Sequence, residues 1–240
     1  MINLSGKTAL ISGGTRGIGK AMVDLFASSG CKVIYTGTKN EEKNLSKDKI
    51  FMQLDLAQDK SVKDFFSRLS TLERIDILVN NAGINIIEPI SEIENENWQK
   101  VLKVNLTGPM LLTREISKKM KRSGGGKILN ISSIFGIMSR QKRNSYSASK
   151  AGLIGLTKSS ALDLAPYNIV VNALCPGFTL TELTTSILSK EEIEALKKEI
   201  PLGRFASVEE IARVALFLCS DLNSYMTGQV VIADGGYILR

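Results

Sequence analysis

Short, nearly continuous apolar runs alternate with helical patterns along the whole of this 240-residue chain. We predict strands at residues 7–12, 32–35, 50–55, 75–80, 127–132, 169–174 and 230–233. Apolar runs without polar alternation are typical of parallel strands that are covered on both faces. This pattern therefore constrains the chain to an α/β architecture with a parallel sheet of about seven strands.

The segments between these runs are expected to be helices. We predict them at residues 18–28, 60–70, 98–122, 145–165, 191–199 and 208–220. Gly108-Pro109 is expected to break the third helix, and Pro166 to end the fourth, because proline lacks a backbone donor. Strand–helix–strand repeats make right-handed crossovers, so we expect a doubly wound sheet with helices on both faces. No linker or repeat divides the chain, which predicts one domain over residues 1–240.

The composition excludes several kinds of site. The chain has no histidine, which rules out a Ser-His-Asp triad, a Cys-His pair and an imidazole metal ligand. Its three cysteines, Cys31, Cys175 and Cys219, are odd in number and far apart. We therefore expect no metal site, no disulfide framework and a reducing cytoplasmic location. No apolar run approaches ~18 residues and the N-terminus lacks a signal-peptide pattern, so no membrane association is expected.

The formal net charge is +7, which favours an anionic ligand or reflects a solvated basic surface. The cations are dispersed among acids, and aromatic residues make up only 6% of the chain. A stacking platform for bases is therefore absent from the sequence pattern. We expect no nucleic-acid partner.

A glycine-rich turn links the first predicted strand to the first predicted helix. Gly13, Gly17 and Gly19 have the spacing Gly-x-x-x-Gly-x-Gly. Glycine tolerates positive φ and lets the backbone approach a pyrophosphate, and the helix N-terminus offers free N–H groups. The alternative is an ordinary tight turn. Its position between a strand and a helix favours a nucleotide site.

This spacing resembles that of the short-chain dehydrogenase/reductase (SDR) family, and the resemblance extends over essentially the whole chain. The matching motifs are Asn80-Asn81-Ala82-Gly83, the tetrad Asn105, Ser133, Tyr146 and Lys150, then Pro176-Gly177 with Thr181, and Asp234-Gly235-Gly236. Ser12 replaces the usual threonine at the turn but keeps a hydroxyl. The resemblance implies a Rossmann-like fold and an NAD(P)-dependent oxidoreductase of CH–OH and C=O groups.

The resemblance also implies which residues contact the dinucleotide. They are Gly13, Thr15, Arg16, Gly17, Ile18, Gly19, Thr38, Lys39, Asp55, Leu56, Asn81, Ala82, Gly83, Tyr146, Lys150, Pro176, Gly177 and Thr181. Asp55 resembles the family residue that binds the adenine amino group. The alternative role for Asp55 is a helix N-cap, and one residue can fill both roles.

Charge at the end of the second strand favours NADPH/NADP+ over NADH. An NAD site usually has an acid there for the ribose 2′-hydroxyl, and residues 35–39 contain none. Arg16 and Lys39 are instead available to pair with a 2′-phosphate. The alternative is that both cations are merely solvated, and the nearby Glu41 and Glu42 weaken the inference.

Tyr146 and Lys150 are four residues apart, so they share one face of a helix. We expect the ammonium to lower the phenol pKa from about 10, so that Tyr146 protonates the substrate oxygen as hydride reaches the carbonyl carbon. Ser133 is expected to hydrogen-bond the same oxygen. By resemblance, Lys150 also holds the nicotinamide ribose, and Asn105 holds a water that links Lys150 to solvent. Tyr-x-x-x-Lys alone is a weak motif, and its alternative is an ordinary amphipathic helix.

Residues 200–205 and 225–229 are most similar to those of 3-oxoacyl-[acyl-carrier-protein] reductases. This predicts the reduction of a carrier-linked 3-oxoacyl thioester to its 3-hydroxyacyl form. Those enzymes tend to hold carrier-docking arginines where this chain has Gly124 and Tyr167, which weakens the prediction. The cations that can compensate in the first region are Lys118, Lys119, Lys121 and Arg122.

Other readings remain open. Arg140, Lys142 and Arg143 precede Tyr146 and are suited to a carboxylate, a phosphate or an acidic carrier, or form a solvated loop. A dehydrogenase or reductase of a sugar, nucleotide-sugar or other small alcohol or ketone is one alternative function. A non-catalytic dinucleotide sensor is a lesser one, because the tetrad is retained. Residues 179–200 are expected to form a substrate lid.

Small residues along the predicted helix 145–165 bear on assembly. They are Ala148, Ala151, Gly152 and Gly155. The resemblance implies a homotetramer or homodimer packed through such helices. The alternative is close packing within one chain.

Overall fold

Seven parallel strands form one sheet in the computed structural model, which describes residues 2–39, 47–182, 184 and 189–239. The strand order is β3-β2-β1-β4-β5-β6-β7. The strands are β1 (Thr8–Ile11), β2 (Lys32–Gly37), β3 (Lys49–Gln53), β4 (Ile77–Asn80), β5 (Gly126–Ile131), β6 (Ile169–Pro176) and β7 (Val230–Ala233). The predicted doubly wound sheet is confirmed, and β2 and β6 continue beyond their predicted ends at residues 35 and 174.

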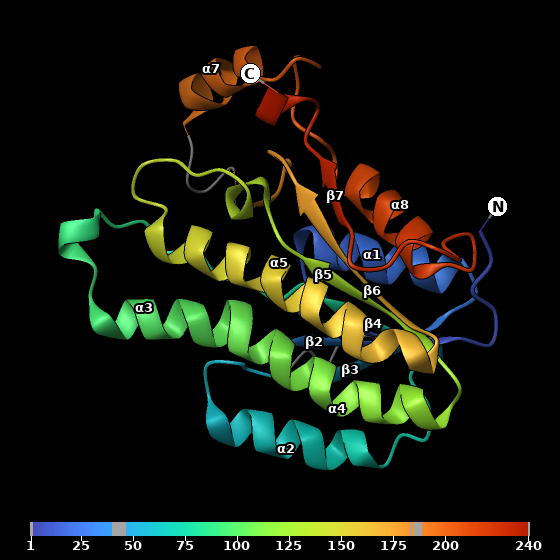
Figure 1. The fold of residues 1–240 in the computed structure, drawn as a ribbon. Coiled ribbons are helices and arrows are strands. Elements are labelled where there is room, and N and C mark those ends of the chain that lie inside the picture. Colours follow the sequence, from blue (N-terminus) through green and yellow to red (C-terminus); the bar gives the residue numbers. More distant parts are fainter. Residues whose placement is uncertain (1, 40–46, 183, 185–188, 240) are drawn as a thin grey trace.

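Helices cover both faces of the sheet (Figure 1). On one face lie α2 (Asp59–Ser70), α4 (Gly108–Arg122) and α5 (Asn144–Leu164), and on the other lie α1 (Gly17–Ser28) and α8 (Val208–Cys219). Helix α3 (Asn95–Leu102) precedes α4, and α7 (Lys190–Glu199) lies near the C-terminal residues. None of the described helices combines the length and apolar character that a membrane crossing requires. No cluster of metal-ligating side chains occurs in the described ranges.

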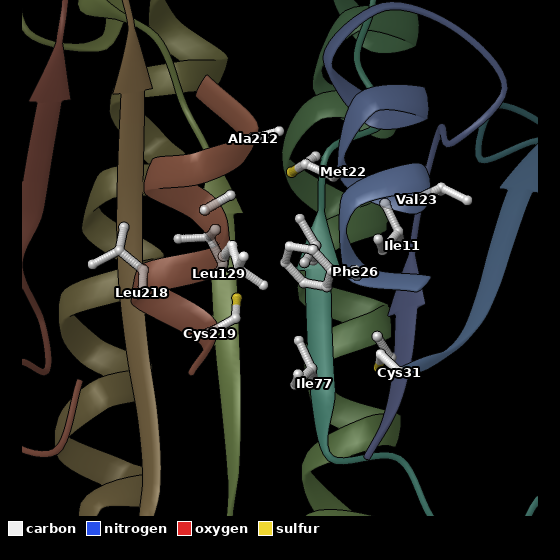
Figure 2. Packing of buried hydrophobic residues seen from close by; sticks show 14 of the residues in the cluster. Ile11, Met22, Val23, Phe26, Cys31, Ile77, Leu129, Ala212, Leu218 and Cys219 are labelled. Carbon is white, nitrogen blue, oxygen red and sulfur yellow. The ribbon is translucent and has the colours of Figure 1, made fainter. Parts of the chain in front are cut away.

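Neighbouring residues of the central strands feed two separate cores, one on each face. The first core joins the sheet to α1 and α8 (Figure 2), and its members include Ile11, Met22, Phe26, Ile77, Leu129, Ala212, Leu218 and Cys219. The second core joins the sheet to α2, α4 and α5, and its members include Leu10, Phe65, Leu69, Leu78, Leu112, Ile116, Ile128 and Leu164. Side chains alternate along a strand, so burial on both faces explains why these strands are apolar at every position.

The break between α3 and α4 differs from the sequence prediction. A π-helical turn at Lys103–Thr107 joins the two helices, and it includes Asn105. Lys103, Thr107 and Gly108 have helical dihedral angles, so α3, the π-helical turn and α4 form one continuous helical run, and α-helical hydrogen bonding resumes at Gly108-Pro109. The regular α-helix is thus interrupted immediately before Gly108-Pro109, where proline removes a backbone donor, but the chain continues in a helical conformation.

The order of the strands reverses between β1 and β4, which are hydrogen-bonded neighbours. Ligands of open α/β sheets bind at such a switch point, outside the carboxyl ends of the strands. The glycine turn follows β1 here, and Asn81 to Gly83 follow β4. The fold thus brings two of the sequence motifs to one crevice.

Candidate active site

The glycine turn after β1 is closed so tightly that side chains would not fit. Gly13 and Gly17 have φ of 66° and 53°, in the region that favours glycine. A Cβ on Gly13 would lie 2.8 Å from Cα of Ala82, and a Cβ on Gly19 would lie 2.0 Å from the carbonyl oxygen of Gly13. The first turn of α1 can therefore pack directly against the turn and the loop after β4.

The N-terminus of α1 is suited to an anion. Its N-cap residue, Arg16, makes no side-chain hydrogen bond to the helix, and the first turn contains no acid. No side chain of the first turn accepts a hydrogen bond from its N–H groups or places a negative charge at the positive end of the helix dipole. Thr181 lies over this turn, with its Cγ2 at 3.6 Å from the position of a Cβ on Gly17. These features fit the pyrophosphate of a dinucleotide, with Thr181 beside it.

Ser12 and Asn81 lock the glycine turn to the loop after β4. The Ser12 hydroxyl accepts hydrogen bonds from the backbone N–H groups of Asn81, at 3.0 Å, and Ala82, at 3.1 Å. Asn81 Nδ2 donates to the carbonyls of Ser12, at 3.0 Å, and Gly13, at 2.9 Å. The side chain of Asn81 thus positions the turn. The resemblance had not singled out Ser12 as a site residue, although its retained hydroxyl was the signal for this role.

The region predicted for the 2′-phosphate is bordered by three exposed residues, Arg16, Thr38 and Lys39. The methyl group of Thr15 lies against the end of β2, since a Cβ on Gly37 would lie 2.5 Å from Thr15 Cγ2. Glu41 and Glu42, which weakened the choice of NADPH, lie outside the described residues. The described residues predicted to contact the 2′-phosphate include two exposed cations, Arg16 and Lys39, a charge pattern that fits NADP+.

Asp55 and Leu56 follow β3 and play different parts. Asp55 Oδ1 accepts a hydrogen bond of 2.9 Å from the N–H of Ala57. The N-cap residue of α2 is Gln58, so the alternative prediction of Asp55 as the helix cap is wrong. Leu56 is buried, and its side chain faces the start of α4, where a Cβ on Gly108 would lie 2.7 Å from it. Only the backbone of Leu56 remains to contact a cofactor.

Three members of the predicted tetrad meet at the carboxyl end of β5. Tyr146 and Lys150 project from α5, and Lys150 Nζ lies 5.6 Å from the centroid of the Tyr146 ring. Lys150 Nζ donates a hydrogen bond of 2.8 Å to the carbonyl of Ile131. Ser133 caps the short helix η3 (Ile134–Gly136), and its Oγ accepts from the N–H of Phe135 at 3.1 Å. The phenol, the ammonium and the hydroxyl thus converge from two elements of the fold.

The pKa values of Tyr146 and Lys150 are both set mainly by burial. Burial raises the pKa of Tyr146 above its usual value, whereas the Ser133 hydroxyl and the charge of Arg143 act to lower it. Burial lowers the pKa of Lys150 to about 8. The expectation that the Lys150 ammonium lowers the phenol pKa is therefore wrong for this state, in which that ammonium is directed to a carbonyl. A raised pKa keeps the phenol protonated at neutral pH, as a proton donor requires.

Asn105, the fourth tetrad residue, is fully buried in the π-helical turn. Its Nδ2 donates to the carbonyl of Ile84 at 2.8 Å and to Ser149 Oγ at 3.0 Å, and its Oδ1 accepts from the N–H of Ile84 at 2.9 Å. A Cβ on Gly83 would lie 3.5 Å from both Asn105 Oδ1 and Lys150 Nζ. The Asn105 side chain thus fixes the loop after β4 against α5 and places Gly83 beside Lys150. Sequence reasoning missed Ser149, since nothing local marks it as a partner.

Two further residues that sequence reasoning missed hold η3 against α5 at Lys150. Ser132 Oγ donates a hydrogen bond of 2.9 Å to the carbonyl of Lys150. A Cβ on Gly136 would lie 2.9 Å from the same carbonyl group, so this position needs glycine. Both contacts fix the distance between Ser133 and the Tyr146–Lys150 pair.

The Pro176-Gly177 segment packs against the C-terminal motif Asp234-Gly235-Gly236 and the residue before it. Gly177 donates a backbone hydrogen bond of 2.9 Å to Ala233, and a Cβ on Gly177 would lie 2.6 Å from Cα of Asp234. The carboxylate of Asp234 accepts from the N–H groups of Gly236 and Ile238, both at 2.9 Å. The C-terminal motif therefore acts as a structural support for the segment that leads to Thr181.

Aromatic side chains form a wall next to Tyr146. The Phe135 ring lies 6.5 Å from that of Tyr146 and 6.1 Å from that of Phe178. Phe178 in turn stacks on Phe205 at 5.3 Å. Tyr237 completes the cluster at 5.1 Å from Phe178. This wall gives the carbonyl site an apolar side.

Arg140 ties the loop before α5 to α7. Its Nη2 pairs with Glu199 at 3.0 Å, and Glu199 also accepts from the Tyr237 hydroxyl at 3.2 Å. A cavity of about 270 Å³ lies beside this contact, lined by Met138, Glu199, Tyr237 and Ile238, and no tetrad side chain lines it. Helix α7 belongs to the predicted lid, of which residues 183 and 185–188 lie outside the described residues.

Comparison with known proteins agrees with this geometry. The family model described as enoyl-(acyl carrier protein) reductase matches residues 13–238. The 3-oxoacyl-[acyl-carrier-protein] reductase FabG of Aquifex aeolicus is 44% identical and covers 98% of both chains. The NAD-dependent glycerol dehydrogenase of Listeria innocua is 36% identical over 99% of this chain and 96% of its own.

Among solved structures, a gluconate 5-dehydrogenase from Burkholderia cenocepacia J2315 in complex with NADP and tartrate aligns with a TM-score of 0.92. It is 31% identical, and the alignment covers 99% of this chain and 97% of that one. Identities of this size over whole chains, together with the matched family model, settle the classification. The chain therefore belongs to the short-chain dehydrogenases/reductases, a family of NAD(P)-dependent oxidoreductases that act on CH–OH and C=O groups.

Proposed function

We propose that this protein uses NADPH to reduce a 3-oxoacyl thioester, carried on acyl carrier protein, to the 3-hydroxyacyl form. The observation that carries the proposal is the convergence of Ser133, Tyr146 and Lys150 at the carboxyl end of β5, next to the glycine turn. The 44% identity with a 3-oxoacyl-[acyl-carrier-protein] reductase over nearly the full length supports this choice of substrate.

Each member of the tetrad has a part in carbonyl reduction. When bound, the nicotinamide supplies a hydride to the carbonyl carbon. Tyr146, held protonated by burial, gives its proton to the carbonyl oxygen, so that C=O becomes CH–OH. Ser133 donates a hydrogen bond to the same oxygen as negative charge develops on it. Lys150 is available to hold the ribose hydroxyls, and Asn105 keeps the loop before it in place.

NADPH is the cofactor that the charges favour. Arg16 precedes α1 and Lys39 follows β2, and both side chains are exposed. Both segments lie at the carboxyl ends of the parallel strands β1 and β2, at the same end of the sheet. Hydrogen bonds from cations to phosphate are short and strong. The 2′-phosphate of NADPH can therefore bind both cations, whereas NADH has no 2′-phosphate to bind them.

The lysines near the end of α4 bear on docking of a carrier protein. Lys119 is buried, and its Nζ donates to the carbonyls of Ser70 and Leu72, so it is committed to structure. Lys121 Nζ lies 3.8 Å from the centroid of the Tyr167 ring, which brings a cation to the second region, where the sequence alone offered none. This patch lies at the amino ends of β5 and β6, at the opposite edge of the sheet from Tyr146.

We infer that a carrier protein docked at the patch would serve the active site of another copy of the chain, because the patch and Tyr146 lie at opposite ends of β5 and β6. We accordingly infer a homotetramer or homodimer. Gly155 on α5 is exposed, with open space around its Cα, as an interface helix requires. Gel filtration with light scattering gives the mass directly, and a monomer at micromolar concentration would remove this part of the proposal.

We further infer a cytoplasmic location. All three cysteines are buried free thiols. Disulfides are rare in the reducing cytosol, so unpaired thiols are the expected state there. Fractionation of cells with an antibody to the protein tests this inference.

A second candidate is the reduction of a small polar ketone, or the reverse oxidation of its alcohol. The loop that precedes Tyr146 places Arg140 and Arg143 beside the aromatic wall, where a long acyl chain would need apolar surface. Relatives named for glycerol and gluconate show that this scaffold serves small polyols as well. This observation favours a sugar or sugar-acid substrate over the remaining alternatives.

The deciding experiment follows NADPH oxidation by its near-ultraviolet absorbance with acetoacetyl groups on acyl carrier protein or coenzyme A. NADH is run in parallel, and a panel of small hydroxy ketones serves as the comparison. Fast turnover of the thioester with NADPH alone supports the first proposal. Turnover confined to the small ketones moves the function to the second candidate. Binding of NADPH without turnover of any carbonyl would favour a dinucleotide sensor.

A further inference from the structure

Arg143 is a half-buried cation that has no acidic partner in the described part of the chain, and its guanidinium lies over the Phe135 ring. It forms no ion pair and no side-chain hydrogen bond among the described residues, although burial lowers the pKa of its guanidinium. Arg140, three residues earlier, differs because it is paired with Glu199 at 3.0 Å. Partly burying a guanidinium without an acid costs free energy, which the cation–π contact with Phe135 offsets only in part.

The backbone around Arg143 is firmly held, so its side chain has a fixed origin. Arg143 is the N-cap residue of α5 and forms a parallel bridge with Glu88, in the loop after β4. The N–H of Glu88 donates to Lys142 at 3.1 Å, and Asn144 Nδ2 donates to the carbonyl of Glu88 at 3.1 Å. These bonds join the two loops that flank the entrance to Tyr146.

An acid is available next to Arg143 but points elsewhere. The Glu88 carboxylate accepts a hydrogen bond of 2.6 Å from Asn97 Nδ2 through Oε1, and its Oε2 is buried without a partner in the described residues. The Glu88 carboxylate is thus engaged by Asn97 and forms no ion pair with Arg143.

The guanidinium lies next to the reacting phenol. Arg143 Cζ is 5.9 Å from the centroid of the Phe135 ring, and that ring is 6.5 Å from the ring of Tyr146. The charge of Arg143 acts on the pKa of Tyr146, so the cation is within electrostatic reach of the proton donor. A group bound to Arg143 would therefore lie near a carbonyl held at Tyr146.

We propose that Arg143 binds a carboxylate of the substrate, and that the preferred substrates are oxo acids, or the matching hydroxy acids, whose carboxylate lies a few bonds from the reacting carbon. The planar fork of a guanidinium matches a carboxylate in charge and in shape. A phosphate dianion would need a second cation, and Arg140 is already neutralised by Glu199. The proposal deepens the second candidate function, because a carrier-linked 3-oxoacyl thioester has no free carboxylate, and it shares with the first candidate only the reduction of a carbonyl at Tyr146.

The test compares an acid with its neutral analogue. We would measure kcat/KM with NADPH for acetoacetate and for methyl acetoacetate, in the wild type, in Arg143→Gln and in Arg140→Gln. Hydrogen bonds to a charged partner predict a loss of about 10- to 100-fold for the acid in Arg143→Gln. The ratio of the two substrates cancels any effect of the lost charge on Tyr146 itself. Arg140→Gln removes a neighbouring guanidinium and should leave the ratio unchanged.

Two readings separate this proposal from the proposed function. An acid-to-ester ratio that is the same in wild type and Arg143→Gln overturns the role of Arg143, even if both substrates are reduced. If neither is reduced, calorimetric titration of the NADP+ complex with acetoacetate decides. Binding that is lost in Arg143→Gln supports the anion site, and absence of binding to the wild type overturns it. Failure of the acetoacetyl thioester assay alone counts only against the thioester.

Discussion

Lys150 donates a hydrogen bond of 2.8 Å from its Nζ to the carbonyl of Ile131, the last residue of β5. Burial lowers the pKa of this ammonium to about 8. We expect the rate of reduction to fall as pH rises through about 8, because the neutral amine no longer supplies charge beside the phenol and the ribose. A pH profile of kcat/KM from 6 to 10 measures this. A profile that stays level across pH 8 would contradict the role of Lys150.

The same pKa makes a prediction about stability. The folded-state pKa of Lys150 is about 8 and the ordinary value is 10.5, so between these values the unfolded chain binds more protons. Stability should therefore rise with pH through this window, by about 3 kcal/mol at 1.36 kcal/mol per unit. Lys150→Met removes the titrating group and should flatten the rise. Urea unfolding of both proteins at pH 7.5 and 10 compares the two slopes, and equal slopes would refute the assignment.

Tyr146→Phe should abolish turnover and spare cofactor binding. Loss of a positioned proton donor costs about 10²- to 10⁴-fold in rate. The Tyr146 hydroxyl interacts with the Ser133 hydroxyl, so the substitution removes one side-chain interaction within the site and should leave the sheet and helices intact. Tyr225→Phe, at a side chain that is 97% exposed, is the matched control. Turnover that survives in Tyr146→Phe would show that another group protonates the carbonyl.

The parts of the site that local patterns determine were predictable, and the parts that depend on tertiary contacts were not. Apolar runs follow from strands covered on both faces, and the glycine spacing follows from a turn that leaves no room for Cβ on Gly13 or Gly19. The pairing of Ser12 with Asn81 joins residues 69 positions apart, which no local pattern encodes. The direction of Lys150 toward Ile131 likewise depends on how α5 meets β5, so the predicted effect on the phenol pKa was wrong.

The turn between α3 and α4 shows the same limit. Gly108-Pro109 was predicted to break a helix because proline removes a donor, and regular α-helical hydrogen bonding is interrupted over the π-helical turn just before these residues, while the chain stays helical. The π-helical turn before it places Asn105 toward Ile84 and Ser149. No local sequence pattern predicts the extra residue of a π-helical turn, because the turn is stabilised by the tertiary contacts of Asn105. Single π-helical turns inside helices often occur at functional sites.

Gly19→Ala and Gly155→Ala should change stability in opposite directions. A Cβ on Gly19 would lie 2.0 Å from a backbone oxygen, so the turn must shift, at a cost of about 1–3 kcal/mol and with weaker NADPH binding. Gly155 is helical with nothing within 4 Å, so alanine should stabilise the protomer by about 1 kcal/mol. Thermal unfolding with and without NADPH measures both variants. If Gly155→Ala instead lowers the unfolding temperature and also converts an oligomer to monomers, the result would locate a subunit interface on α5.

Removal of Arg16 and Lys39 should weaken NADPH binding selectively. Each cation is expected to contribute about tenfold to KM for NADPH, since both are exposed and their phosphate contacts are screened by solvent. The KM for NADH should change little in Arg16→Ala and Lys39→Ala, because NADH lacks the 2′-phosphate. Lys32→Ala is the matched control, an exposed lysine on the same strand at its far end. The salt dependence of the NADPH KM should shrink in the two site variants but not in the control. Equal losses for both cofactors would show instead that these side chains support the glycine turn, and the choice of NADPH would then lose its basis in charge.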